Sequence, residues 1–115
     1  MDYEIKRTKD IAVFKLNEKR LDHSISGMVK AEFTILLHAE DITKLIIDLS
    51  EVESCDSSGL SSLLLAYRIM NTSGGHLRLA SPSKSVLTLI NISQLNRVLT
   101  VTETVQDAIK ELEKV

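Results

Sequence analysis

The stretch of sequence that decides the fold is residues 45–60, LIIDLSEVESCDSSGL. It opens with a short apolar, partly β-branched run, residues 45–49, which is typical of a strand that a parallel sheet buries on both faces. The stretch ends with the capping residue Asp56 and a helical pattern, which predicts a helix starting near Ser57 or Ser58. We therefore expect a central strand that leads through a polar loop into a helix.

Two strands and a helix are predicted before this stretch. Residues 3–6 and 11–16 are short, alternating and β-prone, and the polar residues 7–10 between them predict the turn of an antiparallel hairpin. Ser24 is a good cap for the helix that follows, because apolar residues recur after it at helical spacing. These residues are Ile25, Met28, Val29, Phe33, Leu36 and Leu37.

The alternation of strands and helices continues after residue 60. The glycine pair 74–75 predicts the end of the second helix, and residues 76–80 alternate as a strand. Pro82 then allows a turn into a third helix, residues 98–102 predict a last strand, and Thr104 caps a fourth helix. The apolar residues of these last two helices are Val86, Leu89 and Ile90, then Val105, Ala108, Ile109 and Leu112.

This order of elements predicts an α/β fold. Strands that alternate with helices after an opening hairpin form a mixed, mainly parallel sheet, here with an N-terminal hairpin and about four helices. A length of 115 residues is near the common size of one domain, so we expect residues 1–115 to form a single domain.

Composition excludes several classes of partner and location. The net charge is -2, lysines and arginines are scattered, and aromatic residues make up only 3%, so nucleic acid is not an expected partner. No apolar run approaches the roughly 20 residues that span a bilayer, so direct membrane insertion is not expected. The lone Cys55 cannot form an internal disulfide, and the N-terminus lacks the pattern of a signal peptide. We therefore expect a cytoplasmic protein.

Residues 53–59, ESCDSSG, are the most unusual local string, and they lie between the central strand and the next helix. The N–H groups at a helix start favour negative charge, so an anionic group at Ser58 would be stabilised. Asp56 and Ser57 are also preferred helix caps, and Gly59 permits close packing. Local pattern alone leaves both a capping role and a binding role open.

Catalytic and metal chemistry find little support in the sequence. Ser57 or Ser58 occupies a strand-to-helix turn, but the Gly-x-Ser-x-Gly elbow of serine hydrolases is absent. The histidines do not show the short spacing of zinc sites, and Cys55 has no cysteine partner, so neither a metal nor a cofactor is expected. His23 is predicted in the loop before the first helix, whereas the other two are predicted at a helix end and a strand start. Those two are His38 and His76.

The string from Ile46 to Val52, followed by Asp56-Ser57-Ser58-Gly59-Leu60, resembles the STAS domain (sulfate transporter and anti-sigma factor antagonist). The resemblance covers nearly the whole chain, since the hairpin, the Leu21-Asp22 loop and later positions fit the same pattern. Those later positions are Gly74, Gly75, Leu77, Leu79, Val86, Leu89, Leu95, Val101 and Ala108. The chain departs from the pattern at Lys19-Arg20, where relatives often have glycine, and at Gln94, where Ser-Gly-Leu is common.

The resemblance implies a bacterial regulator of transcription that is not itself an enzyme. In anti-sigma factor antagonists of this family, the serine at the position of Ser58 is phosphorylated by a partner that is both serine kinase and anti-sigma factor. The unphosphorylated form binds that partner and so releases a sigma factor, and a serine phosphatase resets the phosphorylated form. The contact surface implied for this chain consists of Asp22, His23, Ser24, Asp56, Ser57, Ser58 and Gly59.

Two alternatives remain open at this point. A STAS domain can also act as a scaffold, or as an accessory subunit of a transporter or signalling assembly, without a phosphorylation switch. The less favoured alternative is a small serine hydrolase, which would need a base close to Ser58.

Overall fold

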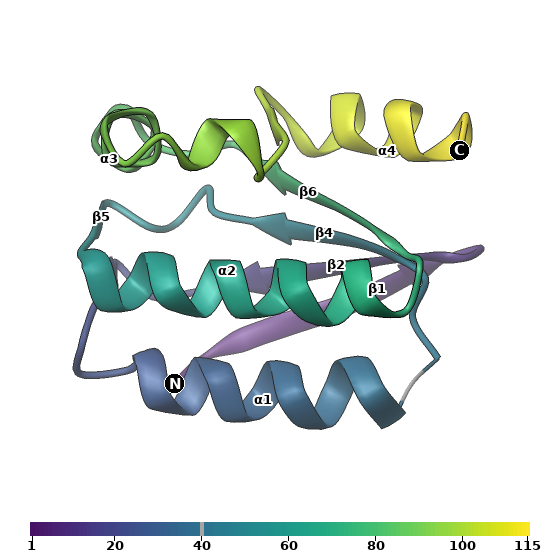
Figure 1. Cartoon of the computed structure of the whole chain (residues 1–115), viewed down its shortest axis with the longest axis horizontal. Coiled ribbons are helices and arrows are strands. Elements are labelled where there is room, and N and C mark those ends of the chain that lie inside the picture. The colour runs from purple at the N-terminus through teal and green to yellow at the C-terminus, as the bar shows by residue number, and fades with distance from the viewer. Residues whose placement is uncertain (40) are drawn as a thin grey trace.

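The computed structural model describes residues 1–39 and 41–115, and these form a single α/β domain (Figure 1). A five-stranded sheet has the order β1-β2-β4-β6-β7, in which β1 and β2 are antiparallel and the other pairs are parallel. Its strands are β1 (Tyr3–Thr8), β2 (Ile11–Leu16), β4 (Lys44–Asp48), β6 (His76–Ala80) and β7 (Val101–Thr102). The predicted fold class, with its N-terminal hairpin, is therefore confirmed.

Helices cover both faces of this sheet. They are α1 (Ser26–Ala39), α2 (Ser57–Thr72), α3 (Lys84–Ile92) and α4 (Val105–Glu113), with a short 3-10 helix η1 (Leu95–Arg97) after α3. Figure 1 shows α1 and α2 side by side on one side of the sheet and α4 on the other. A second, two-stranded sheet pairs β3 (Arg20–Leu21) with β5 (Ser54–Cys55).

The central strand β4 is buried on both faces, as its apolar sequence predicts. Leu45 and Ile47 belong to the main core, to which α1, α2 and α3 contribute. Ile46 points the other way and packs with Ala108 and Leu112 of α4 in a smaller core. Because successive side chains of a strand point to opposite faces, a strand between two helix layers needs an unbroken apolar run.

The hairpin turn and the last strand differ from the prediction. Strand β1 continues to Thr8, so the turn is two residues shorter at its start than expected. The last strand begins at Val101 instead of residue 98. The amides of Val98 and Leu99 donate to the carbonyl of Leu95, at 3.0 and 2.7 Å, and are therefore committed to the end of η1.

The start of the first helix also differs from the prediction. Helix α1 begins at Ser26, and Ser24, the expected cap, lies in the preceding turn. The Ser24 amide and hydroxyl both donate to Oδ1 of Asp22, at 3.0 and 2.5 Å. Met28, expected on the apolar face, is 49% exposed. The apolar spacing therefore found the helix but not its boundary or every buried position.

The start of α2 lies against the two-stranded sheet at Gly59. A Cβ atom on this residue would lie 2.0 Å from the carbonyl oxygen of Leu21 and 2.6 Å from Sγ of Cys55. Neither distance is possible for a real side chain, so glycine is required for this close approach. The contact fixes the end of α2 that carries the two serines.

We expect Gly59→Ala to destabilise the fold by about 1–3 kcal/mol, because the added methyl group would force α2 away from β3. Gly59→Val should cost more, since a branched Cβ is bulkier and stiffer. Gly27→Ala in α1 is the matched control, because a Cβ there meets nothing within 4 Å. It should stabilise the helix by up to about 1 kcal/mol. Urea unfolding of the three variants would contradict this account if Gly59→Ala matched wild type.

Candidate functional site

The two-stranded sheet, which no pattern in the sequence predicts, brings two distant loops together. Strand β3 pairs in parallel with β5, so Leu21 lies opposite Cys55. The amides of Glu53 and Ser54 both donate to the carbonyl of Lys19, at 2.7 and 3.2 Å. This pairing holds the loop of residues 22–24 beside the start of α2.

Asp56 links this loop to the helix. One oxygen of its carboxylate, Oδ1, accepts a hydrogen bond from the Gly59 amide at 2.9 Å, which caps α2. The other, Oδ2, accepts from the His23 amide at 3.1 Å and lies 3.6 Å from the His23 ring Nδ1. The Gly59 amide, followed by these His23 contacts, lowers the pKa of Asp56 below its usual 3.8. The charged carboxylate therefore links the loop to the start of the helix through hydrogen bonds.

Asp22 places a second carboxylate in the same region. Its bonds from the hydroxyl and amide of Ser24 lower the pKa of Asp22, with the hydroxyl as the larger cause. Both carboxylates are therefore charged at neutral pH. The structure thus brings together the predicted contact residues of the loop and of the helix start.

Ser57 and Ser58 are the first two residues of α2, directly after the Asp56 cap. Ser57 is exposed, Ser58 is half-buried and Gly59 is buried. The first N–H groups of a helix lack intrahelical acceptors, so this end carries partial positive charge. The first turn of α2 holds no acidic side chain that would use it. Because Asp56 performs the capping, the hydroxyls of Ser57 and Ser58 are not needed for it.

Cys55 lies under this surface as a neutral, half-buried thiol. Burial, with smaller effects of the Asp56 and Asp22 charges, raises the pKa of Cys55 to about 12. Its Sγ lies 3.3 Å from the carbonyl oxygen of Asp56. A thiol that stays protonated is a poor nucleophile, so Cys55 packs as a small hydrophobe.

The histidines do not form a catalytic arrangement with the serines. The ring of His23 lies near Asp56, His38 ends α1 with Nδ1 2.6 Å from the Thr34 carbonyl, and His76 opens β6. Among residues 1–39 and 41–115, no hydrogen bond joins a histidine ring to Ser57 or Ser58. Within the same residues, no cluster of histidine, cysteine and acidic side chains could hold a metal ion.

An apolar groove next to Ser57 was not predicted. It lies between α2 and the end of α3 with η1 and has a volume of about 270 Å³. It is lined by Ser57, Leu60, Ser61, Leu64, Ser93 and Leu95. The leucines of α2 belong to the helical pattern of the sequence. Leu95 lines the groove only because the short helix η1 follows α3.

No helix in the described part of the chain is long and apolar enough to cross a membrane.

Comparison with known families and proteins identifies relatives of this chain. The family model of the STAS domain matches residues 2–108. The anti-sigma F factor antagonist of Paenibacillus polymyxa is 24% identical over 115 residues, which are 100% of this chain and 97% of that protein.

Solved structures share the fold. The crystal structure of TM1081 from Thermotoga maritima, a candidate anti-sigma factor antagonist, has a TM-score of 0.86 at 25% identity and covers 96% of this chain and 94% of that one. The anti-sigma factor antagonist SpoIIAA in its unphosphorylated form has a TM-score of 0.81 at 22% identity, over 99% and 98% of the two chains. SpoIIAA of Bacillus in its phosphorylated form has a TM-score of 0.72 at 22% identity, over 96% and 98%. The match to the family model over almost the full length shows that this chain belongs to the STAS domain family.

Proposed function

We propose that this protein is an anti-sigma factor antagonist that phosphorylation of Ser58 switches off. The observation that carries the proposal is the position of Ser58, half-buried at the start of α2 and one residue from an apolar groove. The relative named as an anti-sigma F factor antagonist, which matches over the full length, supports it. The proposed partner is an anti-sigma factor with serine kinase activity.

In the unmodified state, the start of α2 and the adjoining loop form the proposed contact surface. It consists of Asp22, His23, Ser24, Asp56, Ser57, Ser58 and Gly59. Small hydroxyl groups at Ser57 and Ser58 allow a partner to approach closely, and the groove beside them can bury an apolar side chain of that partner. Capture of the anti-sigma factor in this way would release its sigma factor.

Phosphorylation of Ser58 would add a charge of about -1.5 to -2 to this surface. The helix start tolerates that charge, so the domain stays folded. For the partner the same charge is costly, because it joins the charged Asp22 and Asp56 and must be desolvated in a close interface. Binding is therefore lost without unfolding, and a serine phosphatase would restore it in the cytoplasm.

In this proposal the protein is a substrate and a binding module, not an enzyme. A serine hydrolase needs a base that takes the proton of the nucleophile, and the imidazole of His23 lies against Asp56 instead. A scaffold role without the switch would use the same fold, and it differs in one observable, the phosphorylation of Ser58.

Ser58 should be the phosphoacceptor, and its substitutions should separate binding from folding. Ser58→Ala should bind the kinase as tightly as wild type, because a methyl group keeps the surface small and uncharged. Ser58→Asp should stay folded but lose about 2–5 kcal/mol of binding free energy, a loss of tens to thousands of fold in affinity. Titration calorimetry with the kinase recovered by affinity capture, together with phosphosite mapping by mass spectrometry, measures both effects.

Ser57→Asp is the matched control for this experiment. It places the same charge one residue earlier, at an exposed position of the same helix turn. A weaker effect than that of Ser58→Asp would show that position and not charge alone sets the switch. Phosphate on another residue, or full affinity in Ser58→Asp, would contradict the switch and favour the scaffold role.

Asp56 should make the stability of the domain depend on pH. Its pKa is lowered in the folded state, so its stabilising contribution is present above 3.8 and is lost as the pH falls through the folded-state pKa. We expect Asp56→Asn to lower the Tm at neutral pH, and the difference from wild type to shrink as the pH falls to about 3. Thermal unfolding followed by circular dichroism tests this, and a difference that stays constant across the range would contradict it.

The purified protein should not turn over esters at a rate that depends on Ser58. The expected result is equal, background hydrolysis of activated esters by wild type, Ser58→Ala and His23→Gln, because no base is oriented toward the serine. A rate that fell in both variants would favour the hydrolase alternative.

A further inference from the structure

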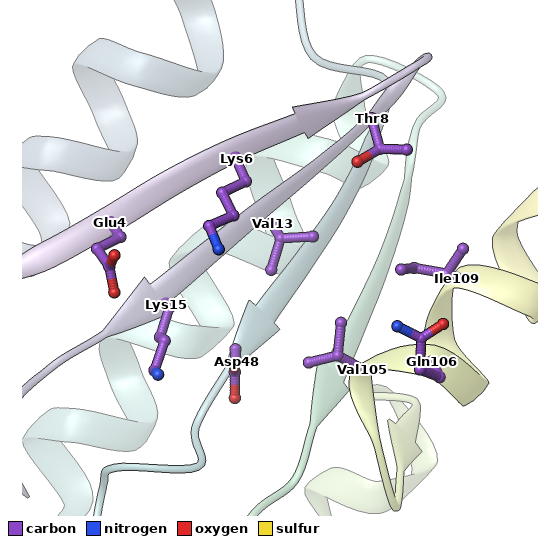
Figure 2. Close-up of a pocket in the computed structure, with 9 residues that line it drawn as sticks. All are labelled: Glu4, Lys6, Thr8, Val13, Lys15, Asp48, Val105, Gln106 and Ile109. Atoms are coloured by element: carbon purple, nitrogen blue, oxygen red, sulfur yellow. The ribbon is translucent and has the colours of Figure 1, made fainter.

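A second concave surface lies on the other face of the sheet and is separate from the Ser58 region. Helix α4 packs mainly on β4 and β6. On the same face of β2 only Ile11 and Val13 pack with α4, and no residue of β1 belongs to this core. The groove between these strands and the start of α4 has a volume of about 330 Å³. Figure 2 shows side chains of β1 and β2 on one side of it, those of α4 on the other, and Asp48 between them.

Strand register places opposite charges side by side in this groove. Glu4 lies opposite Lys15 in the β1–β2 pair, and Lys15 lies opposite Asp48 in the β2–β4 pair. The sequence of charges across three strands is therefore negative, positive, negative. Lys6 adds a second ammonium group from β1, beside Val13.

These charges are not satisfied by each other. Within the described residues, neither Lys6 nor Lys15 forms an ion pair with a carboxylate. Asp48 is only 8% exposed, and its Oδ1 accepts one hydrogen bond from the Ser50 amide at 2.9 Å. Its side chain nevertheless lines the groove. Asp48 and the two lysines thus line the same groove with opposite charges.

The remaining wall of the groove is apolar. Val13 from β2 and Val105 and Ile109 from α4 line it, and all three are half-buried. A small anion would meet the carboxylates of Glu4 and Asp48, and a small cation would meet two ammonium groups. Only a ligand that carries both charges and an apolar part can pair with the carboxylates and the ammonium groups and also contact the apolar wall.

We propose that this groove binds a small zwitterion with an apolar side chain, the chemistry of an aliphatic α-amino acid. The ligand ammonium group pairs with Asp48, its carboxylate pairs with Lys6 and Lys15, and its side chain packs on Val105 and Ile109. The volume lies at the small end of the range for small-molecule sites. The lining shares no residue with the groove beside Ser57, so the inference does not depend on the phosphorylation switch.

The test is an NMR titration of ¹⁵N-labelled protein with L-leucine as the probe. Shift changes should be confined to β1, β2, the end of β4 and the first two turns of α4, with a Kd on the order of 1 mM. Two analogues test the need for both charges: isopentylamine lacks the carboxylate, and 4-methylpentanoate lacks the ammonium group. Each should bind at least about tenfold more weakly, since each loses one of the two charge pairs.

Matched lysine variants test the location. Lys15→Met keeps the apolar stem of the side chain and should weaken L-leucine binding about tenfold or more without lowering the Tm. Lys30→Met on α1 removes the same charge on the other side of the sheet and should leave binding unchanged. The proposal is overturned by an absence of shifts, by equal binding of either analogue, or by unchanged binding in Lys15→Met.

Discussion

The close approach of α2 to the Leu21 carbonyl is the constraint on which the rest of the site depends. No side chain fits between the helix and β3, so Gly59 alone allows the two-stranded sheet to sit under the helix start. That sheet in turn sets the loop of residues 22–24 within reach of Asp56. A single carboxylate then fixes both the helix and the loop, and the two serines are presented next to it.

The sequence predicts best those elements whose pattern is set by burial. The run 45–49 is apolar except for Asp48, because helices cover both faces of β4. The cap at Asp56 and the stop at the glycine pair 74–75 are also local signals, and α2 runs from Ser57 to Thr72 as they indicate. Strands β3 and β5 could not be found in this way, because two residues carry no periodicity and their pairing is a tertiary event.

The same distinction applies to the site. The serines and Asp56 stand together in one short string, so the sequence alone could single them out. The contact between His23 and Asp56 and the groove lined by Leu95 arise from chain segments that only folding brings together. Likewise, the charges at Glu4, Lys15 and Asp48 look unrelated along the chain and become one row only through strand register.

The capping of α2 by Asp56 has an evolutionary consequence. Because Asp56, and not either serine, accepts the hydrogen bond that caps α2, the cap places no demand on the identity of residues 57 and 58. A substitution at either position leaves the cap intact, whereas a change at Asp56 or Gly59 removes the cap or the close approach of the helix. A serine can therefore be gained or lost at the start of α2 in one mutational step, without a compensating change in the cap.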